Sequence, residues 1–147
     1  MNNINLEVAL SLAQHTLAEG RTRGFAPLTA AVLDSGGHLV ALLRADGSSL
    51  LRPQIATGKA WGALGLGFGG RELARRAATM PAFFNALSDL SAGNMVPVPG
   101  GILIRDTSNA LLGAIGVSGE TSDKDELCAV EAIRAAGLVA DTGDALK

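Results

Sequence analysis

The N-terminal part of the chain carries a regular pattern of apolar residues between residues 5 and 20. Four of these residues recur at steps of three and four, the spacing that brings side chains to one face of a helix. They are Leu6, Leu10, Ala13 and Leu17. Asn5 suits the N-cap of such a helix, and Gly20 suits its end because glycine readily adopts the left-handed conformation found there. The pattern therefore predicts a helix over residues 5–20.

The same segment carries a second row of residues on its other side. Val8, Leu12 and His15 also follow one another at steps of four and three. A helix with two such faces has to bury both of them. One face can pack on the chain's own sheet, whereas the other needs a ligand, another helix or another subunit. We expect a bound molecule or a second subunit to cover the row that contains His15.

Four segments rich in Leu, Ile, Val and Ala predict β-strands. They are residues 28–33, 38–43, 102–105 and 110–117. The first two are separated by residues 34–37 (DSGG), whose glycines tolerate the positive φ of a tight turn, so these strands are expected to form a hairpin. Gly113 and Gly116 interrupt the last strand and indicate a bulge or a close approach of another backbone.

Helical patterns lie between the strand pairs and near the end of the chain. They cover residues 53–64, 71–79 and 123–136, and the apolar pattern of residues 83–90 is also compatible with a helix. Pro53 suits a first helical turn, and Ser122 suits an N-cap. The predicted order is α-β-β-α-β-β-α. Strands joined by hairpins imply an antiparallel sheet with helices on its faces, an α+β fold. The length of 147 residues suits one domain, residues 1–147.

Composition narrows the classes of function. Apolar residues make up 48% of the chain and charged residues 18%, enough for a buried core. With 12 basic and 14 acidic residues, the formal charge of −2 offers no basic excess for nucleic acid. Cys128 is the only cysteine and is expected to be a small buried residue rather than part of a disulfide. We see no signal peptide and no apolar stretch that could span a membrane, so we expect a cytoplasmic protein.

Few side chains are candidates for chemistry. His15 suits a ligand to haem iron, an acid–base group or a residue packed at a subunit contact. A lone histidine offers no cage for zinc. His38 is expected at the end of the sheet and partly exposed. Arg44, Asp46 and Lys59 form the densest group of charges, which indicates either a surface salt bridge or a clamp for an anionic group.

The loop of residues 118–122 precedes the last predicted helix. Backbone N–H groups at a helix start attract anions. We therefore expect a carboxylate of a ligand to bind at this loop, assisted by Lys59 or Arg44.

Several blocks of the sequence resemble the GlcG/HbpS-like family. In chain order they are DSGGHLVA at 34–41, RADG at 44–47, KA at 59–60, GG at 100–101, LGAIGVSG at 112–119 and DE at 125–126. These are similar to the family's DxGGxLxAxxRxDGA block, its KA pair and its GG…xGAxGVSG signature. The chain departs from the pattern at Ala45, where the family usually has Met, at Ser48 in place of Ala, and at Ile102, where a Pro is usual.

The resemblance implies a profilin-like fold, in which helices flank both faces of a central antiparallel sheet. It also implies a homo-oligomer, from dimer to octamer. The family includes haem-binding proteins and the C-terminal domain of PduO-type corrinoid adenosyltransferases. Some relatives bind haem through the first helix region, which makes His15 the expected axial ligand of the iron. Arg44, Lys59, Gly100 and Gly101 complete the expected ligand site.

Three functions follow from these observations. The first is an oligomeric, cytoplasmic small-molecule binding protein whose ligand is haem or another tetrapyrrole, with Lys59 and Arg44 pairing with its carboxylates. The second is a cofactor-independent catabolic enzyme, a lyase or isomerase acting on a small carboxylated or aromatic compound. In that enzyme His15 or Glu131 would be the acid–base group. The third is a purely structural, scaffolding oligomer.

Overall fold

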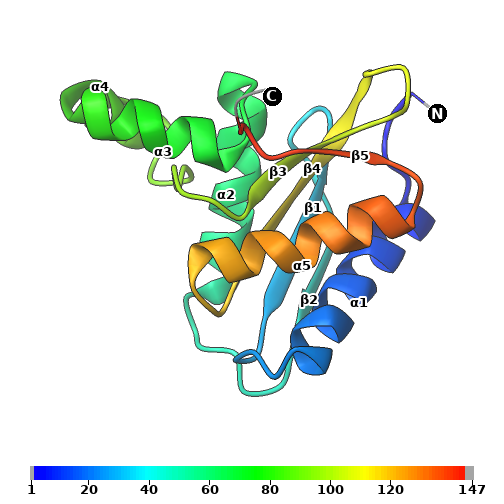
Figure 1. Cartoon of the computed structure of the whole chain (residues 1–147). Helices are drawn as coiled ribbons and strands as arrows, with labels where there is room; N and C mark the ends of the chain where they lie inside the picture. The colour runs from blue at the N-terminus through cyan, green and yellow to red at the C-terminus, as the bar shows by residue number, and fades with distance from the viewer. Residues whose placement is uncertain (1, 145–147) are drawn as a thin grey trace.

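The computed structural model describes residues 2–144 and forms a five-stranded antiparallel sheet with helices on both faces (Figure 1). In chain order the elements are α1 (Leu6–Thr22), β1 (Thr29–Asp34), β2 (Leu39–Arg44), α2 (Arg52–Leu66), α3 (Gly70–Thr79), α4 (Pro81–Leu90), β3 (Gly101–Arg105), β4 (Leu111–Ser118), α5 (Ser122–Ala135) and β5 (Val139–Asp141). The strand order is β2-β1-β4-β3-β5, and all neighbours are antiparallel. The α+β fold predicted from the sequence is confirmed.

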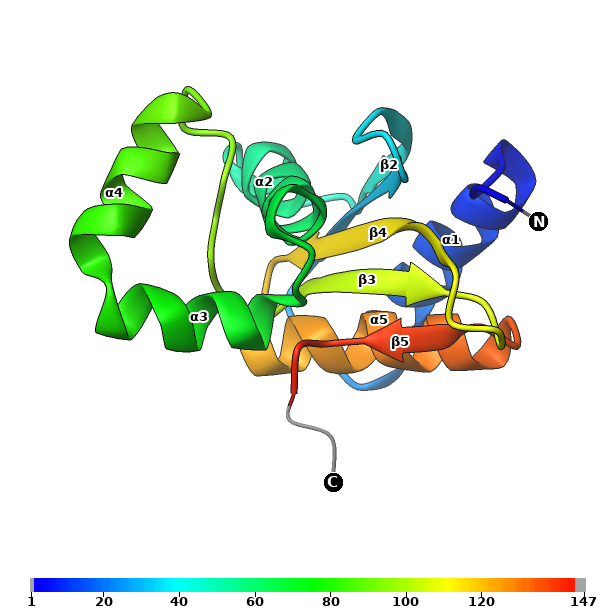
Figure 2. The ribbon, with the colours of Figure 1, turned by 90° about the horizontal axis from the view of Figure 1, so that it is seen from above.

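The sheet separates two apolar layers. Ala30 and Val32 of β1 point to the layer shared with α1 and α5, while Ala31 and Leu33 point to the layer shared with α2. This alternation follows from the two-residue period of a strand. Figure 2 shows α2 and α5 on opposite sides of the sheet. Each layer therefore has its own core, and a side chain on α1 is separated from one on α2 by the sheet itself.

Helix α1 buries one broad face rather than two. Its buried residues are Ala9, Leu12, Ala13, Thr16, Leu17 and Gly20. The predicted division into two rows was wrong, because Leu12 and Ala13 lie in one core cluster together with residues of α5, whereas Leu6 is 62% exposed. A bound molecule or second subunit is not needed over Leu12, since α5 of the same chain packs beside α1.

The ends of the helices differ slightly from the sequence prediction. Asn5 caps α1 as expected, because its side chain accepts a hydrogen bond from the Val8 N–H at 2.9 Å. Gly20 lies inside α1, where a Cβ would come within 2.6 Å of Leu28 Cδ1, so the glycine serves packing rather than termination. Thr121, not Ser122, occupies the N-cap position of α5. Strand β5 was not predicted, because three residues are too short for a recognisable pattern.

Glycines allow α2 to lie unusually close to the sheet. A Cβ on Gly116 would lie 1.8 Å from the carbonyl oxygen of Ala56, well inside van der Waals contact. The side chains of α2 that face the sheet are also small, and Ala56, Ala60 and Ala63 are completely buried. The close backbone approach predicted at Gly116 is therefore confirmed, and it sets how near α2 lies to β4.

Helices α3 and α4 extend away from the sheet (Figure 2). They are anchored by a small apolar cluster in which Leu73, Phe84 and Met95 are buried. Phe83, on the other side of α4, is 53% exposed. Cys128 is fully buried in α5 as predicted, and burial raises the pKa of its thiol to about 11. Within residues 2–144 we find no helix whose length and apolar character would suit a membrane crossing.

Candidate functional site

Lys59 is buried where α2, β4 and α5 meet. Its side chain is only 3% exposed, and its Nζ donates to the Val117 carbonyl oxygen at 2.8 Å. The same Nζ lies 3.2 Å from Oδ2 of Asp125, whose side chain is 1% exposed. Burial lowers the pKa of Lys59 and raises the pKa of Asp125, and the attraction between the two groups opposes both shifts. Lys59 therefore has its ion partner inside the chain.

The two glycines expected at the ligand site surround this lysine. A Cβ on Gly100 would lie 2.9 Å from Lys59 Nζ, and one on Gly101 would lie 2.3 Å from the Lys59 carbonyl oxygen. Gly100 also has a φ of 106°, which side chains other than hydrogen rarely allow. The Gly100–Gly101 pair thus leaves space for Lys59 and for its helix. This space explains why glycine occupies both positions.

The loop of residues 118–122 binds a carboxylate of the chain itself. Asp125 accepts a hydrogen bond from the Glu120 N–H through Oδ1, at 2.8 Å. Beside it, Arg52 donates from Nη1 to the Ser118 hydroxyl at 3.0 Å. Asp125 therefore occupies the position in which we expected the carboxylate of a ligand. The sequence pattern indicated neither Arg52 nor a role for Asp125, which appeared there only as part of the DE block.

Glu126 is a second buried carboxylate at the start of α5. Its Oε1 accepts a hydrogen bond from Arg71 Nε at 2.9 Å, while Oε2 is buried and has no partner among residues 2–144. Burial raises the pKa of Glu126, and the nearby Arg71 only partly offsets that shift. The folded protein therefore holds the proton of Glu126 more tightly than the unfolded chain does.

This difference predicts a pH effect on stability. As the pH rises above the ordinary Glu126 pKa of 4.5, the unfolded chain releases this proton first, so the contribution of Glu126 to stability falls until the raised pKa is passed. In urea unfolding from about pH 4 to about pH 7, Glu126→Gln should therefore gain stability relative to the wild type as the pH rises. Parallel pH profiles for the two proteins would contradict this interpretation.

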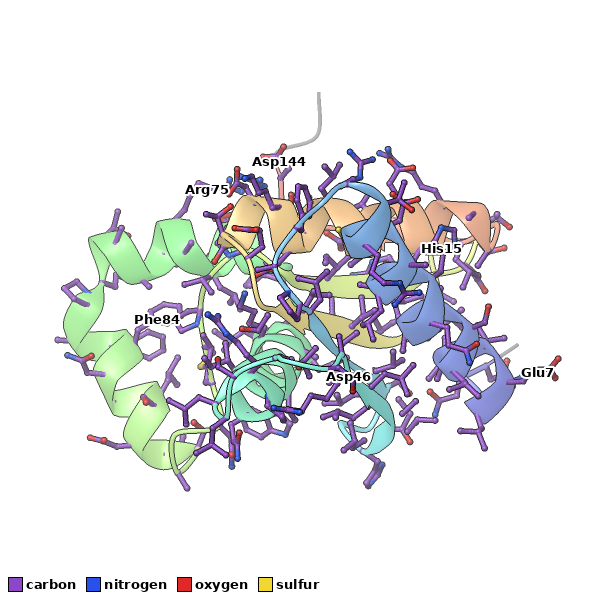
Figure 3. The ribbon with its side chains drawn as sticks, turned by 90° about the horizontal axis from the view of Figure 1, so that it is seen from below. Glu7, His15, Asp46, Arg75, Phe84 and Asp144 are labelled. Carbon is purple, nitrogen blue, oxygen red and sulfur yellow. The ribbon has the colours of Figure 1, made fainter. Side chains whose placement is uncertain are left out.

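His15 lies on α1 beside α5 (Figure 3). Its side chain is 38% exposed, and Nε2 is 3.4 Å from Oε1 of Glu19. The other Glu19 oxygen accepts a hydrogen bond from Arg23 Nε at 3.1 Å, which fixes the carboxylate. The remaining ring nitrogen of His15 has no hydrogen-bond partner in the described part of the chain. His15 is thus an imidazole within reach of solvent and oriented by a carboxylate.

The other acid–base candidates are less well placed. Glu131 is half-buried on α5 and makes no hydrogen bond or ion pair within residues 2–144. His38 lies at the end of the sheet as expected, but it precedes β2 and its side chain is 81% exposed rather than partly exposed, with Nδ1 3.1 Å from Oδ1 of Asp34. The backbone N–H of His38, more than its ring, lowers the pKa of Asp34. This Asp34–His38 contact closes the hairpin turn.

The structure does not bring the expected ligand residues together in one chain. His15 is on α1, whereas Lys59 is on α2 and therefore on the opposite face of the sheet. Arg44, at the end of β2, is exposed and donates from Nη2 to the Ser48 carbonyl oxygen. The expected charge cluster is also divided, because Lys59 pairs with Asp125 while Arg44 and Asp46 line a cleft elsewhere.

Comparison with known protein families identifies the family to which the sequence blocks around Lys59, Gly100 and Asp125 belong. A family model described as haem-degrading protein HbpS-like matches residues 4–134. The chain belongs to the HbpS-like family. The match contains Lys59, Gly100 and Asp125, so the buried ion pair and the glycines around it lie within the family region. No curated protein sequence matches the chain significantly.

Solved structures agree with this assignment of the HbpS-like chain. A double mutant of HbpS from Streptomyces reticuli is 28% identical, with a TM-score of 0.78 over 92% of this chain and 88% of that one. The Klebsiella pneumoniae protein ORFY is 27% identical, with a TM-score of 0.77 over 92% and 93%. A PduOC:heme complex has a TM-score of 0.81 over 97% and 99%, and its 21% identity shows a shared fold alone.

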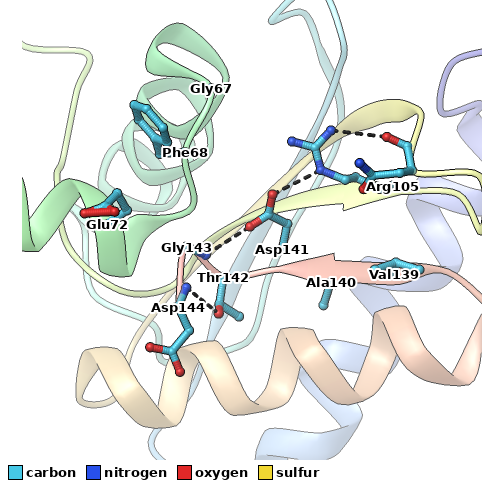
Figure 4. Close-up of a pocket in the computed structure, with 11 residues that line it drawn as sticks. Gly67, Phe68, Glu72, Arg105, Val139, Ala140, Asp141, Thr142, Gly143 and Asp144 are labelled. Carbon is cyan, nitrogen blue, oxygen red and sulfur yellow. Dashed lines mark hydrogen bonds and ion pairs between the residues drawn. The ribbon is translucent and has the colours of Figure 1, made fainter. Parts of the chain in front are cut away.

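The HbpS-like chain has a hollow of about 530 Å³ beside β5 (Figure 4). Its charged lining residues already have partners within the chain. Arg105 Nε lies 3.0 Å from Asp141 Oδ2, while Glu72 and Asp144 lie 3.3 and 3.7 Å from nitrogens of Arg75. Because each of these charges already has an ion partner in the chain, the hollow offers few groups to recognise a ligand.

Proposed function

We propose that this HbpS-like protein binds haem or a related tetrapyrrole, with His15 as the axial ligand of the iron. The observation that carries the proposal is the match of residues 4–134 to a family described as haem-degrading. HbpS of Streptomyces reticuli, at 28% identity, is a structurally similar member of the same group. Haem would supply the redox and ligand-binding chemistry of its iron.

The environment of His15 fits an axial imidazole. Histidines that bind metals usually donate their second ring N–H to a carboxylate or carbonyl, which fixes the ring and its tautomer. Glu19 is in a position to accept that hydrogen bond, and Arg23 holds Glu19 in turn. The 38% exposure of the His15 side chain leaves the ring within reach of a macrocycle.

The composition of the chain leaves few alternatives to His15. The sequence has two histidines and no tyrosine, and its single thiol, Cys128, is fully buried. His38 is therefore the natural competitor for iron. Arg44 is exposed and suited to pair with a haem carboxylate, whereas Lys59 is already paired with Asp125.

Self-association is part of the proposal. A haem bound at His15 would lie on the outside of one chain, and a second copy would cover it. Apolar residues exposed around α4 also support an oligomer, since exposed apolar patches often mark interfaces. They include Met80 (42% exposed), Phe83 (53%) and Leu90 (84%).

A haemin titration tests the axial ligand. The wild-type protein should give a saturable shift of the Soret band, and His15→Ala should remove that shift because no second histidine is at the site. His38→Ala is the matched control and should titrate like the wild type. Native mass spectrometry of the loaded protein reports the number of subunits and retained haems. An unchanged Soret shift in His15→Ala would reject His15 as the ligand.

A further inference from the structure

A cleft of about 400 Å³ lies between the end of α1, the start of β1 and the turn that follows β2. These segments meet at the bottom of Figure 1, and Figure 3 labels Asp46 on that turn. Two arginines, Arg21 and Arg44, line the cleft. Its apolar lining includes Leu17 and Leu28, which are buried, and the half-buried Phe25. The cleft thus combines cationic groups with an apolar floor.

Arg44 is held in place by buried polar residues. Its Nη2 donates to the Ser48 carbonyl oxygen, and the Ser48 hydroxyl is 2.8 Å from the hydroxyl of Thr29. Thr29 and Ser48 are 0% and 3% exposed, so this support is part of the protein interior. One side of the guanidinium is therefore fixed, and its remaining N–H groups are available to an acceptor. Such a pre-organised donor loses little freedom when it binds a carboxylate.

The charge of the cleft favours a single negative group. Neither Arg21 nor Arg44 forms an ion pair with an acid of residues 2–144, and the lining includes one acid, Asp46. The formal charge of the lining side chains is therefore +1, from two arginines and one aspartate. Carbonyl groups at the end of α1 would repel an anion, but Gly20 and Arg21 already accept hydrogen bonds at 2.9 and 3.1 Å from backbone N–H groups.

We propose that this cleft binds a small carboxylic acid with an apolar body, such as an aromatic monocarboxylate. The carboxylate would accept hydrogen bonds from Arg44 and Arg21, and the apolar body would rest on Leu17 and Leu28. A volume of about 400 Å³ is within the usual range for small-molecule sites. This site goes beyond haem binding and does not depend on His15, which does not line the cleft. Arg44 is the one residue that it shares with the proposed haem contacts.

Calorimetric titration of the haem-free protein with benzoate tests the site. The wild type should bind benzoate saturably, with one site per chain. Arg44→Gln and Arg21→Gln should each weaken binding at least tenfold, because each removes a charge-assisted hydrogen bond. Arg134→Gln, an exposed arginine of α5 outside the cleft, is the control for net charge and should bind like the wild type. Benzyl alcohol, which lacks the carboxylate, should give no saturable binding.

Three results would overturn the proposal. They are the absence of saturable benzoate binding to the wild type, unchanged affinity in both Arg44→Gln and Arg21→Gln, and an equal loss of affinity in Arg134→Gln. The Arg21 side chain is exposed and makes no hydrogen bond within residues 2–144, so Arg21→Gln should fold normally, and its affinity reports on the cleft alone. Haemin and benzoate are titrated separately, so a failure of haem binding by His15 and a failure of this cleft are distinguishable.

Discussion

Replacement of Gly116 by alanine is expected to lower the free energy of unfolding by about 3 kcal/mol, the upper part of the usual range for overpacking. The added Cβ would lie 1.8 Å from the Ala56 carbonyl oxygen and 2.9 Å from the Ala60 backbone nitrogen. These are backbone atoms of α2, so no side-chain rotation can relieve the clash and the whole helix has to move. Urea unfolding followed by circular dichroism measures the effect.

Gly65→Ala is the matched control for that substitution. Gly65 is in the last turn of α2, and a Cβ there would meet nothing closer than Trp61 Cζ3 at 3.9 Å. Because alanine favours a helix over glycine, this variant should be as stable as the wild type or more stable by up to about 1 kcal/mol. Equal stability of Gly116→Ala and the wild type would mean that α2 does not pack this closely on β4.

Replacement of Lys59 by methionine is expected to cost about 3–5 kcal/mol of stability, the range found when one partner of a buried ion pair is removed. Asp125 would keep its hydrogen bond from the Glu120 N–H but lose its only cation within 4 Å among residues 2–144. A carboxylate that is 1% exposed is poorly solvated, so the cost comes from the unpaired charge rather than from the lost methylene packing.

A double-mutant cycle separates these two contributions. Asp125→Asn can still accept the Glu120 N–H, and in Lys59→Met/Asp125→Asn neither charge remains. The double variant should therefore be more stable than the sum of the single effects predicts. Additive effects of the two substitutions would show that Lys59 and Asp125 do not interact, and would reject the ion pair as the reason for the buried lysine.

Much of the fold was predictable because local patterns decide it. The glycines of residues 34–37 specify the hairpin between β1 and β2, and Pro53 marks the first turn of α2. Gly116 indicated a close backbone approach, although the sequence could not show that the approaching backbone is that of Ala56. The prediction for α1 was wrong about which of its faces is buried. From the spacing alone, Leu12 and Ala13 could belong to two separate apolar rows. Only the position of α5 shows that both belong to one buried face.

The candidate site was less predictable because its contacts are long-range. Lys59 and Asp125 are 66 residues apart, and no periodicity relates a lysine of α2 to an aspartate of α5. Asp125 resembled an ordinary acidic residue at a helix start, where its charge would be favourable on the surface as well. Lys59 resembled a free cation, because its partner lies 66 residues away in the sequence. Spatial proximity, and not residue type, turns these two side chains into a buried pair.

Strand β2 forms one edge of the sheet, and its outer side has no neighbouring strand among residues 2–144. The five residues 39–43 (LVALL) carry no charge, so an extended segment of another chain can pair with the open N–H and C=O groups there without electrostatic repulsion. His38 and Arg44 flank this run, the positions at which polar or charged residues oppose aggregation of an apolar strand. The exposed charge of Arg44 therefore stands at the end of the one stretch of this edge that another chain could extend.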